Sequence, residues 1–411
     1  MFQLKLKEEN NAGERLVLSQ LKNTEISFWV DSSGGPEESS KHSFIGVNPK
    51  YMIYGSLNEV FLEQSGEKVK IQKNCFDFLE EKIKEEKENK DGIFVGYLTY
   101  DLFHTRTSNY PDFFFAYFDN IQSLNPKELK PHEPKSIGLI ALQKLKTNMT
   151  NTEYLEKVKH IKNEIKEGNV YQANLTREYS ITLDDVDEID LYRKLRNVSP
   201  NPFGCYFKTP FVTILSSSPE EFLKIENRNK EKFITTRPIK GTLPKGVFEI
   251  DPKNKAENLM IVDLERNDLG KVCEPGSVKA VKLLDIETYQ HLNHVVSTIE
   301  GKLKPNISLK NIFEAMFPGG SVTGAPKIAA MRIISEVEPT PRRGYTGTFG
   351  YIKTDGTMDF NILIRTIFIE NKIITFNIGG GIVADSDPQE ELEEIKLKAR
   401  GILNTLGIEK L

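Results

Sequence analysis

The residues most suited to chemistry lie in the segment Arg237-Pro238-Ile239-Lys240-Gly241-Thr242. We expect Lys240 to lie on a turn rich in proline and glycine between polar strands, where Gly241 leaves space beside the amine. A primary amine whose charge is disfavoured by burial or by nearby cations becomes a nucleophile near neutral pH. Taken alone, Lys240 is better explained as a solvated surface lysine, because most lysines have no chemical role. Its interpretation therefore depends on the other polar segments of the chain.

A glycine-rich segment at residues 317–327 leads into a predicted helix with an apolar pattern. The apolar positions are Ile328, Met331, Ile334 and Val337. Backbone N–H groups at such a helix start, with Thr323 and Lys327 beside them, suit an anion. Because no Gly-Lys-Ser/Thr follows at P-loop spacing, we expect a carboxylate site and not a nucleotide site. The alternative is a tight turn that needs the flexibility of glycine.

A second glycine run, Gly379-Gly380-Gly381, is expected to end a strand over 373–378, where bare backbone can approach a ligand closely. Alone, it could be a β-bulge.

The helix after this run has clear signals, with Asp387 as N-cap and Pro388 at the first position. Its predicted buried stripe is Leu392, Ile395, Ala399, Ile402 and Leu406. Glu391, Glu394 and Lys398 follow the edge of this stripe at spacings of three and four, so both carboxylates can point into one cleft. The alternative is an acidic first turn that satisfies the helix dipole, with a Glu394–Lys398 surface pair.

A further predicted helix over 256–268 is dense in carboxylates for a segment with so many apolar residues. Carboxylates on facing helices, completed by water and substrate, suit Mg²⁺, and Glu257 with Glu394 is the candidate pair. His291 and His294 lie three residues apart without a third soft ligand, so substrate-facing or hydrogen-bonded histidines are expected. Arg365 interrupts a predicted apolar strand over 360–369 and needs a partner such as a substrate carboxylate.

Local patterns indicate the elements that must position these residues. Helical spacing over 154–165 stops at Gly168, and a half-buried strand over 171–181 follows. Alternation along that strand places Gln172, Asn174 and Thr176 on one polar face. Short apolar runs at 96–102 and 113–115 predict strands in an N-terminal region. We expect this strand-rich region, residues 1–135, to pack against a catalytic domain over 150–411, with a Pro/Lys-rich connection at 125–135.

Composition excludes several function classes. The 411 residues are 38% hydrophobic and 28% charged with a net charge of −4, so no electrostatic footprint for nucleic acid or an anionic membrane appears. No apolar run approaches the length of a membrane span. Cys75, Cys205 and Cys273 lack metal-ligand spacing, and their odd number points to a reducing, cytoplasmic compartment.

Taken together, these segments resemble the chorismate-utilising enzymes, a family that includes anthranilate, aminodeoxychorismate, isochorismate and salicylate synthases. The resemblance covers roughly residues 154–406, and its most specific stretches are 238–242, 257–268, 319–327 and 379–398. It implies an α/β (α+β) fold in which large antiparallel sheets pack face to face with helices outside, and it implies Mg²⁺ and chorismate between them.

Two positions discriminate within the family. Members that add water to chorismate carry a lysine base where this chain has Gln172, and an amide cannot deprotonate water, so an ammonia-using enzyme is indicated. Anthranilate synthases have alanine at the position of Lys240, whereas Lys240 resembles aminodeoxychorismate synthase component I, of the 4-aminobenzoate and folate pathway. The resemblance implies amination of chorismate to 4-amino-4-deoxychorismate through a lysine-bound intermediate. It also implies a separate glutamine amidotransferase subunit that supplies ammonia, since no cysteine lies in a Gly-x-Cys-x-Gly pattern.

Residue roles follow from the same resemblance. It implies that Glu220 is the general acid, that Lys240 is the nucleophile and that His294 lies near the departing hydroxyl. The Mg²⁺ ligands would be Glu257, Glu394 and nearby Glu391. The chorismate-binding residues would be Gln172, Thr242, Thr323, Gly324, Tyr345, Arg365, Gly379, Gly380, Gly381 and Lys398. Two alternatives are an anthranilate synthase component I with an unusual lysine, and a catalytically inactive regulatory subunit on the same fold.

Overall fold

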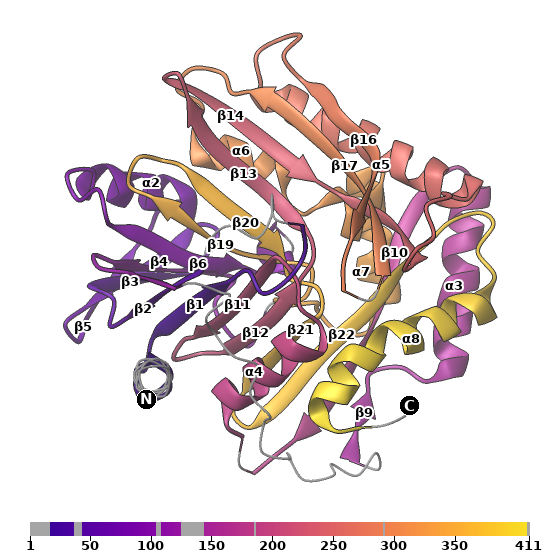
Figure 1. Cartoon of the computed structure of the whole chain (residues 1–411), viewed down its shortest axis with the longest axis horizontal. Coiled ribbons are helices and arrows are strands. Elements are labelled where there is room, and N and C mark those ends of the chain that lie inside the picture. The colour runs from indigo at the N-terminus through magenta and orange to yellow at the C-terminus, as the bar shows by residue number, and fades with distance from the viewer. Residues whose placement is uncertain are drawn as a thin grey trace, which may run out of the picture.

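The computed structural model describes residues 17–36, 43–103, 108–124, 144–184, 186–290 and 292–408. Within these ranges, the strands form two large sheets, one of ten strands and one of twelve. Figure 1 shows how the elements are arranged. The helices are α2 (Cys75–Glu85), α3 (Asn151–Lys166), α4 (Glu188–Val198), α5 (Pro252–Val272), α6 (Leu309–Met316), α7 (Lys327–Val337) and α8 (Pro388–Leu406), with short 3₁₀ turns η1 (Tyr100–Phe103) and η3 (Gly320–Val322).

The ten-stranded sheet begins at β18 and ends at β8. Its order is β18 (Gly324–Ala325), β10 (Gln172–Thr182), β22 (Ile373–Ile382), β21 (Thr366–Glu370), β12 (Thr213–Ser218), β11 (Phe203–Lys208), β1 (Ser27–Asp31), β2 (Ser43–Val47) and β8 (Gln122–Leu124), with β9 (Lys146–Thr147) also paired to β10. Its described pairings are antiparallel.

The twelve-stranded sheet is also antiparallel. Its order is β15 (Ile239–Pro244), β17 (Leu292–Lys302), β14 (Glu231–Arg237), β13 (Glu221–Arg228), β20 (Met358–Ile362), β19 (Thr348–Lys353), β6 (Ile93–Leu98), β7 (Phe113–Phe118), β3 (Tyr51–Ser56), β4 (Glu59–Gln64) and β5 (Glu67–Ile71), with β16 (Lys279–Thr288) also paired to β17.

Three apolar clusters hold these layers together. One packs the ten-stranded sheet against α3, α4, α7 and α8, and a second packs the twelve-stranded sheet against α2, α5 and α6. The third lies between the sheets, where Phe28 of β1 and Phe114 of β7 are both fully buried. The predicted arrangement of face-to-face antiparallel sheets with helices outside is therefore confirmed.

The two sheets exchange strands at one corner. The chain leaves β12 at Ser218 and enters β13 of the other sheet at Glu221, and it passes in the same way from β20 to β21 through Arg365. These crossings lie side by side, because the N–H of Ile362 donates to the carbonyl of Glu220 over 3.0 Å. Glu220 and Arg365 therefore lie at the same corner between the sheets.

This crossing corrects the strand predicted over 360–369, which is two strands in different sheets. Arg365 has a φ of 51°, so the backbone leaves extended geometry there. The glycine run was also misplaced, because β22 continues through Ile382 and Gly379-Gly380-Gly381 lies within a strand. The strand predicted over 171–181 is confirmed as β10, but its polar face is buried, not solvated.

The predicted apolar stripe of the helix after Lys327 is wrong at its start. Ile328 is 85% exposed, whereas α7 buries Ala330, Ile333, Ile334 and Val337. The expected stripe of the last helix is confirmed in α8, and Asp387 is its N-cap, accepting from the N–H groups of Gln389 and Glu390.

In the part of the chain that the structure describes, no helix is both long and apolar enough to cross a membrane.

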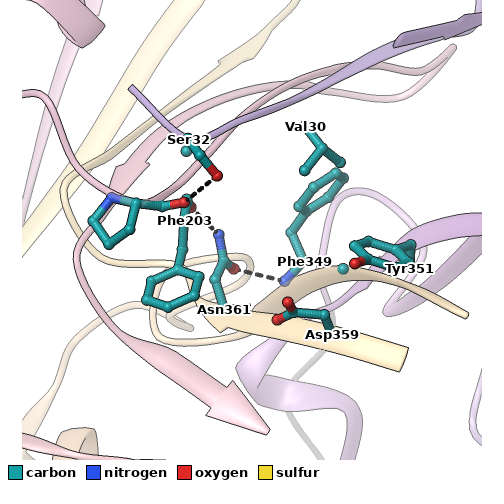
Figure 2. A pocket seen from close by; sticks show the side chains of 10 residues that line it. Val30, Ser32, Phe203, Phe349, Tyr351, Asp359 and Asn361 are labelled. Carbon is teal, nitrogen blue, oxygen red and sulfur yellow. Dashed lines mark hydrogen bonds between the residues drawn. The ribbon is translucent and has the colours of Figure 1, made fainter. Parts of the chain in front are cut away.

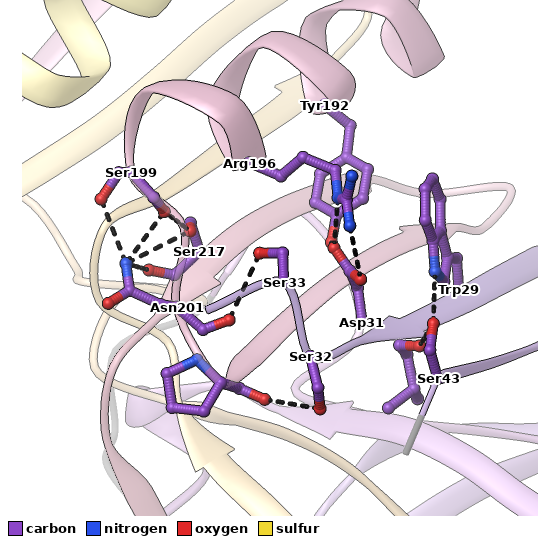
Figure 3. Close-up of polar contacts among 12 residues, drawn as sticks. Trp29, Asp31, Ser32, Ser33, Ser43, Tyr192, Arg196, Ser199, Asn201 and Ser217 are labelled. Atoms are coloured by element: carbon purple, nitrogen blue, oxygen red, sulfur yellow. Dashed lines mark hydrogen bonds and ion pairs between the residues drawn. The ribbon is translucent and has the colours of Figure 1, made fainter. Parts of the chain in front are cut away.

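The boundary expected between an N-terminal region, residues 1–135, and a catalytic domain, residues 150–411, does not separate one sheet from the other. Strand β1 pairs with β11, and β6 pairs with β19, so each sheet combines strands from both segments. A buried ion pair reinforces this union. Figure 3 shows Arg196 of α4 donating to both oxygens of Asp31 of β1, over 2.6 and 3.2 Å. The predicted connection at 125–135 lies outside the described residues.

A cavity of about 50 Å³ lies between the sheets, as Figure 2 shows. It is lined by Val30 and Gly204 from one sheet and by Phe349, Tyr351 and Asp359 from the other. Asn361 spans the sheets at its edge, accepting from the N–H of Phe349 and donating to the carbonyl of Phe203. The sheets are thus tied by hydrogen bonds as well as by apolar packing.

Candidate active site

Lys240 and Glu220 are brought together at the corner between the sheets. The Lys240 amine donates to the carbonyl oxygen of Ser321 over 2.6 Å, and the N–H of Ile239 donates to Glu220 Oε1 over 3.4 Å. Burial raises the pKa of Glu220, while nearby Ser321, Lys240 and Arg365 oppose this rise. A buried carboxyl with a raised pKa is suited to donate a proton near neutral pH.

Lys240 lies within β15 and not on the turn expected from its sequence. The unusual feature is its neighbour Gly241, which has a φ of +102°, a backbone conformation that favours glycine. The pairing register of β15 with β17 shifts at this position. Burial lowers the pKa of Lys240, and Lys398 acts in the same direction, against the opposite effect of Glu257 and Glu220. A lowered pKa increases the fraction of free amine, as a nucleophilic lysine requires.

His294, Thr242 and Arg365 form a hydrogen-bonded group on the same side of the site. Arg365 Nη2 lies 3.3 Å from His294 Nε2, and Thr242 Oγ1 lies 3.2 Å from His294 Nδ1. Since a guanidinium can only donate, Nε2 accepts, and the ring proton lies on Nδ1. Burial, with a contribution from Arg365, lowers the pKa of His294 to about 3. The imidazole is therefore neutral and orients Arg365.

Gln172 presents an unsatisfied amide to the site. Its side chain is only 1% exposed, and neither Oε1 nor Nε2 has a hydrogen-bond partner among the described residues. A Cβ atom at Gly381, on the neighbouring strand β22, would clash with Nε2, so the glycine makes room for the amide. Buried polar groups are normally paired, and this one is suited to a small polar ligand.

The carboxylates of α8 face Gly380 across the site. A Cβ at Gly380 would lie 3.3 Å from Glu391 Oε2 and 3.8 Å from Lys398 Nζ. Lys398 pairs with Glu394 over 2.6 Å, and Ser386 donates to Glu391 over 2.6 Å. Burial raises the pKa of Glu391; burial also acts to raise that of Glu394, but Lys398 outweighs it and the pKa of Glu394 is lowered.

Glu257 of α5 completes this acidic group. Burial raises its pKa, and the charge of Glu394 adds to the rise while Lys240 and Lys253 oppose it. Among the described residues, no group of three or more carboxylate, histidine or cysteine side chains is arranged to hold a metal ion. The donor set nevertheless fits Mg²⁺, which binds hard oxygen ligands and keeps positions for water and substrate.

Thr323, Gly324 and Tyr345 lie against the strands β10 and β22. The N–H of Asn174 donates to the carbonyl of Thr323 over 2.9 Å, and Gly324 has a φ of +133° where a side chain would clash with the Gln172 carbonyl. Tyr345 is buried, and burial raises its pKa, while the backbone of Gly379 acts in the opposite direction. Tyr345 and Gly379 are therefore close together.

One prediction from the glycine-rich segment is wrong, and the sequence analysis missed Ser321 and Lys253. Lys327 does not face an anion in the site, because its amine pairs with Asp268 over 2.6 Å. Ser321 was not singled out, although its carbonyl holds Lys240. Lys253, 4.0 Å from Glu391, was also missed, as an exposed lysine at a helix start carries no sequence signal. His291 lies outside the described residues.

Comparison with known proteins gives a consistent result. The family described as chorismate binding enzyme matches residues 25–404. The chain is 31% identical to a chloroplastic aminodeoxychorismate synthase of Arabidopsis thaliana over 92% of its own length, but it spans only 50% of the length of that relative. It is 32% identical to anthranilate synthase component 1 of Methanothermobacter marburgensis, over 93% of this chain and 90% of that protein.

A solved structure shows the same fold. The anthranilate synthase component I of Streptococcus pneumoniae superposes with a TM-score of 0.72 at 24% identity, covering 92% of each chain. At this identity the likeness concerns the fold alone, and relatives with two different reactions are similarly close.

Proposed function

Because the chain belongs to the chorismate-binding enzyme family, we propose that it is an aminodeoxychorismate synthase component I. It would be a transferase that converts chorismate and ammonia to 4-amino-4-deoxychorismate. The observation that carries this proposal is the Lys240 amine, which lies at the corner that also holds the buried carboxyl of Glu220. An acid that holds a proton beside a deprotonated amine supports displacement of a hydroxyl by nitrogen.

In the first displacement, the Lys240 amine attacks ring C2, both conjugated ring double bonds shift toward C4, and the C4–O bond breaks while Glu220 gives its proton to the oxygen, which leaves as water. Ammonia then attacks C4, both double bonds shift back, and the lysine nitrogen is expelled from C2. Glu220 regains a proton from the attacking nitrogen. The product therefore carries nitrogen at C4, and the Lys240 amine is regenerated.

The other side chains bind and orient. The Arg365 guanidinium, held by neutral His294, suits a carboxylate of chorismate. The unpaired amide of Gln172 supports ammonia as second substrate, because an amide can hydrogen-bond ammonia but cannot act as a base toward water. Glu257, Glu391 and Glu394 would hold Mg²⁺, which when bound would neutralise and position the ring carboxylate of the substrate.

The proposal includes a separate glutamine amidotransferase that supplies ammonia. Cys75, Cys205 and Cys273 are all buried and free, so none is exposed as the nucleophile of a glutaminase. The same reduced cysteines support a cytoplasmic setting.

The test is to incubate the purified chain with chorismate, Mg²⁺ and either ammonium or glutamine. With an added lyase, ammonium should yield 4-aminobenzoate, and glutamine should yield none. Fluorescent anthranilate as main product would instead support the anthranilate synthase alternative. Absence of chorismate consumption with ammonium would support an inactive regulatory subunit, and turnover of glutamine by the pure chain would contradict the separate partner.

A further inference from the structure

A buried arginine behind the site takes no part in the mechanism above. Arg342 is only 3% exposed, and its guanidinium forms a two-point ion pair with Glu338, directly after α7, over 2.9 Å from Nε and 2.8 Å from Nη2. Glu338 is buried to the same degree. A buried ion pair often stabilises a fold no better than apolar residues of the same volume would, so stability alone does not explain this pair.

Arg342 makes five hydrogen bonds, as many as a guanidinium has N–H groups. Two of them go to Glu338. The other three reach separate segments: Nη1 donates to the carbonyl of Val322 over 2.9 Å and to Thr346 Oγ1 over 3.2 Å, and Nη2 donates to the carbonyl of Asn174 over 3.1 Å. Because the guanidinium is planar and rigid, it fixes these segments relative to one another.

The Arg342–Glu338 pair also covers a stretch of the edge of β10 with which, among the described residues, no strand pairs. Strand β18 pairs with β10 only at its first two residues, and β9 pairs with it only near its end. Between them, the carbonyl of Asn174 accepts from Arg342, and the N–H of Thr176 donates to Glu338 Oε1 over 2.9 Å. Buried backbone groups need partners, so the pair takes the place of a neighbouring strand along this part of β10.

Arg342 thereby connects two groups that the proposed reaction must bring together. Val322, whose carbonyl it holds, follows Ser321, whose carbonyl accepts from the Lys240 amine over 2.6 Å. The strand that Arg342 holds at its other side, β10, carries the unpaired amide of Gln172. The positions of the nucleophilic amine and of the amide that faces ammonia therefore depend on one guanidinium.

We propose that Arg342 is a positioning residue, which fixes the Gln172 amide relative to the Lys240 amine and so directs the approach of ammonia to C4. Arg342 contacts no reacting atom, and it forms or breaks no bond in either displacement. Misplacing a reactant by about 1 Å can cost about 100-fold in rate, so such support matters for turnover. The inference rests on the proposed function through the roles of Gln172 and Lys240.

The test is the KM for ammonium, at saturating chorismate and Mg²⁺, in the wild type and in Arg342→Lys. The lysine keeps the charge beside Glu338, but its single nitrogen cannot hold two carbonyls in the plane of a guanidinium. The KM for ammonium should rise at least about tenfold. A merely structural role would lower the fraction of folded enzyme, and hence kcat, while this KM stays unchanged, and that result would overturn the proposal.

Glu338→Gln covers the case in which Arg342→Lys does not fold. The amide oxygen can still accept from Arg342 Nη2 and from the N–H of Thr176, but an NH₂ group replaces the oxygen that accepts from Arg342 Nε. The KM for ammonium should then rise by about two- to fivefold, because the guanidinium is held less firmly. An unchanged KM in this variant would contradict the proposal.

Arg196→Lys is the matched control. Arg196 is also buried in a two-point ion pair, with Asp31, and its guanidinium lies 5.3 Å from the ring of Trp29, as that of Arg342 lies 4.5 Å from the ring of Tyr100. Thermal unfolding should show a similar loss of stability, while the KM for ammonium stays within about twofold of the wild type. An equal rise in KM would overturn the proposal, because the loss of any buried ion pair would then have the same effect.

Hydrogen exchange in the free protein separates this inference from the proposed function. Backbone amides of residues 172–178 and 320–325 should exchange faster in Arg342→Lys than in the wild type, and in Arg196→Lys they should exchange as in the wild type. Unchanged exchange in Arg342→Lys would overturn the inference even if 4-amino-4-deoxychorismate is formed. If anthranilate is the product, the proposed function fails, but the exchange and the KM still test Arg342, because ammonia remains the nucleophile.

Discussion

The amine of Lys240 donates a 2.6 Å hydrogen bond to the backbone carbonyl of Ser321, which joins β15 to the glycine-rich segment at residues 317–327. These residues are 81 positions apart in the chain. A backbone carbonyl accepts a hydrogen bond but does not take a proton from the amine, so it orients Lys240 without changing its charge. The glycine-rich segment therefore holds the Lys240 amine in place.

We expect Lys240→Ala to abolish formation of 4-amino-4-deoxychorismate while the fold and Mg²⁺ dependence remain. The change removes a nucleophile and no apolar core contact, and with C2 open, ammonia could attack there to give traces of anthranilate. Product analysis by chromatography measures both. Lys245→Ala is the control, since Lys245 is exposed and donates to the backbone carbonyl of Gln290. Near-wild-type synthesis by Lys240→Ala would show that the amine has no covalent role.

Glu257→Gln and Glu394→Gln should each weaken Mg²⁺ and chorismate together, by at least about tenfold in apparent affinity. The reason is that one ion would join protein carboxylates to the substrate carboxylate, and excess Mg²⁺ should restore part of the activity. Kinetic titration of Mg²⁺ at fixed chorismate measures the effect. Glu393→Gln should be nearly silent, because Glu393 is exposed and pairs with Lys396. Unchanged Mg²⁺ dependence in the first two variants would favour a purely structural acidic turn.

Gly381→Ala should lower turnover by about 100-fold while stability changes little. The added Cβ would displace the flexible Gln172 amide and not the backbone, so the damage falls on the site. Gly401→Ala in α8 has open space around its Cβ and should stabilise the protein by about 0.5–1 kcal/mol without loss of activity. Thermal unfolding and kcat distinguish the two, and full activity of Gly381→Ala would remove Gln172 from the site.

His294 should make the folded protein less stable in acid. Its pKa is lowered to about 3, mainly by burial, whereas an unfolded histidine titrates near 6.5. Below about pH 6.5, the unfolded chain therefore binds a proton that the folded protein does not. The free energy of unfolding then decreases by about 1.4 kcal/mol per pH unit as the pH falls toward 3, and above about pH 6.5 this loss is absent. Chemical denaturation between pH 7 and 5 should show a shallower loss for His294→Gln.

His160→Gln is the control for this pH dependence, because His160 is exposed on α3. Its unfolding free energy should follow the wild-type curve. If His294→Gln and the wild type lost stability equally between pH 7 and 5, His294 would not be held neutral by burial.

Local signals in the sequence were sufficient for several elements. The N-cap Asp387, the first-turn Pro388 and the apolar stripe of α8 are set by contacts within a few residues, and the structure has all of them. The same holds for β10, whose alternation placed Gln172 and Asn174 on one face. The motifs around Lys240, Glu257 and Gly380 also carried the family resemblance, because each combines reactive or flexible residue types within a short stretch of the sequence.

Other features depend on residues far apart in the chain. An apolar run through Ile362 and Ile367 reads as one strand, and only the pairing of β20 with β13 and of β21 with β12 divides it between two sheets at Arg365. Lys327 was assigned to an anion because its partner Asp268 is 59 residues away. In the same way, the burial of Glu265 follows from how α5 packs on the glycine-rich turn.

The sequence by itself therefore determined the reactive groups and the elements that carry them, because these follow from side-chain chemistry and from short-range periodicity. Only the tertiary structure decided which charged groups lie near one another, which groups are buried and where the backbone crosses between sheets. The physical reason is that burial and electrostatic coupling depend on distances through space. Gln172 is an ordinary polar residue in the sequence, and only the fold buries its amide without a partner among the described residues, beside Gly381 of the neighbouring strand β22.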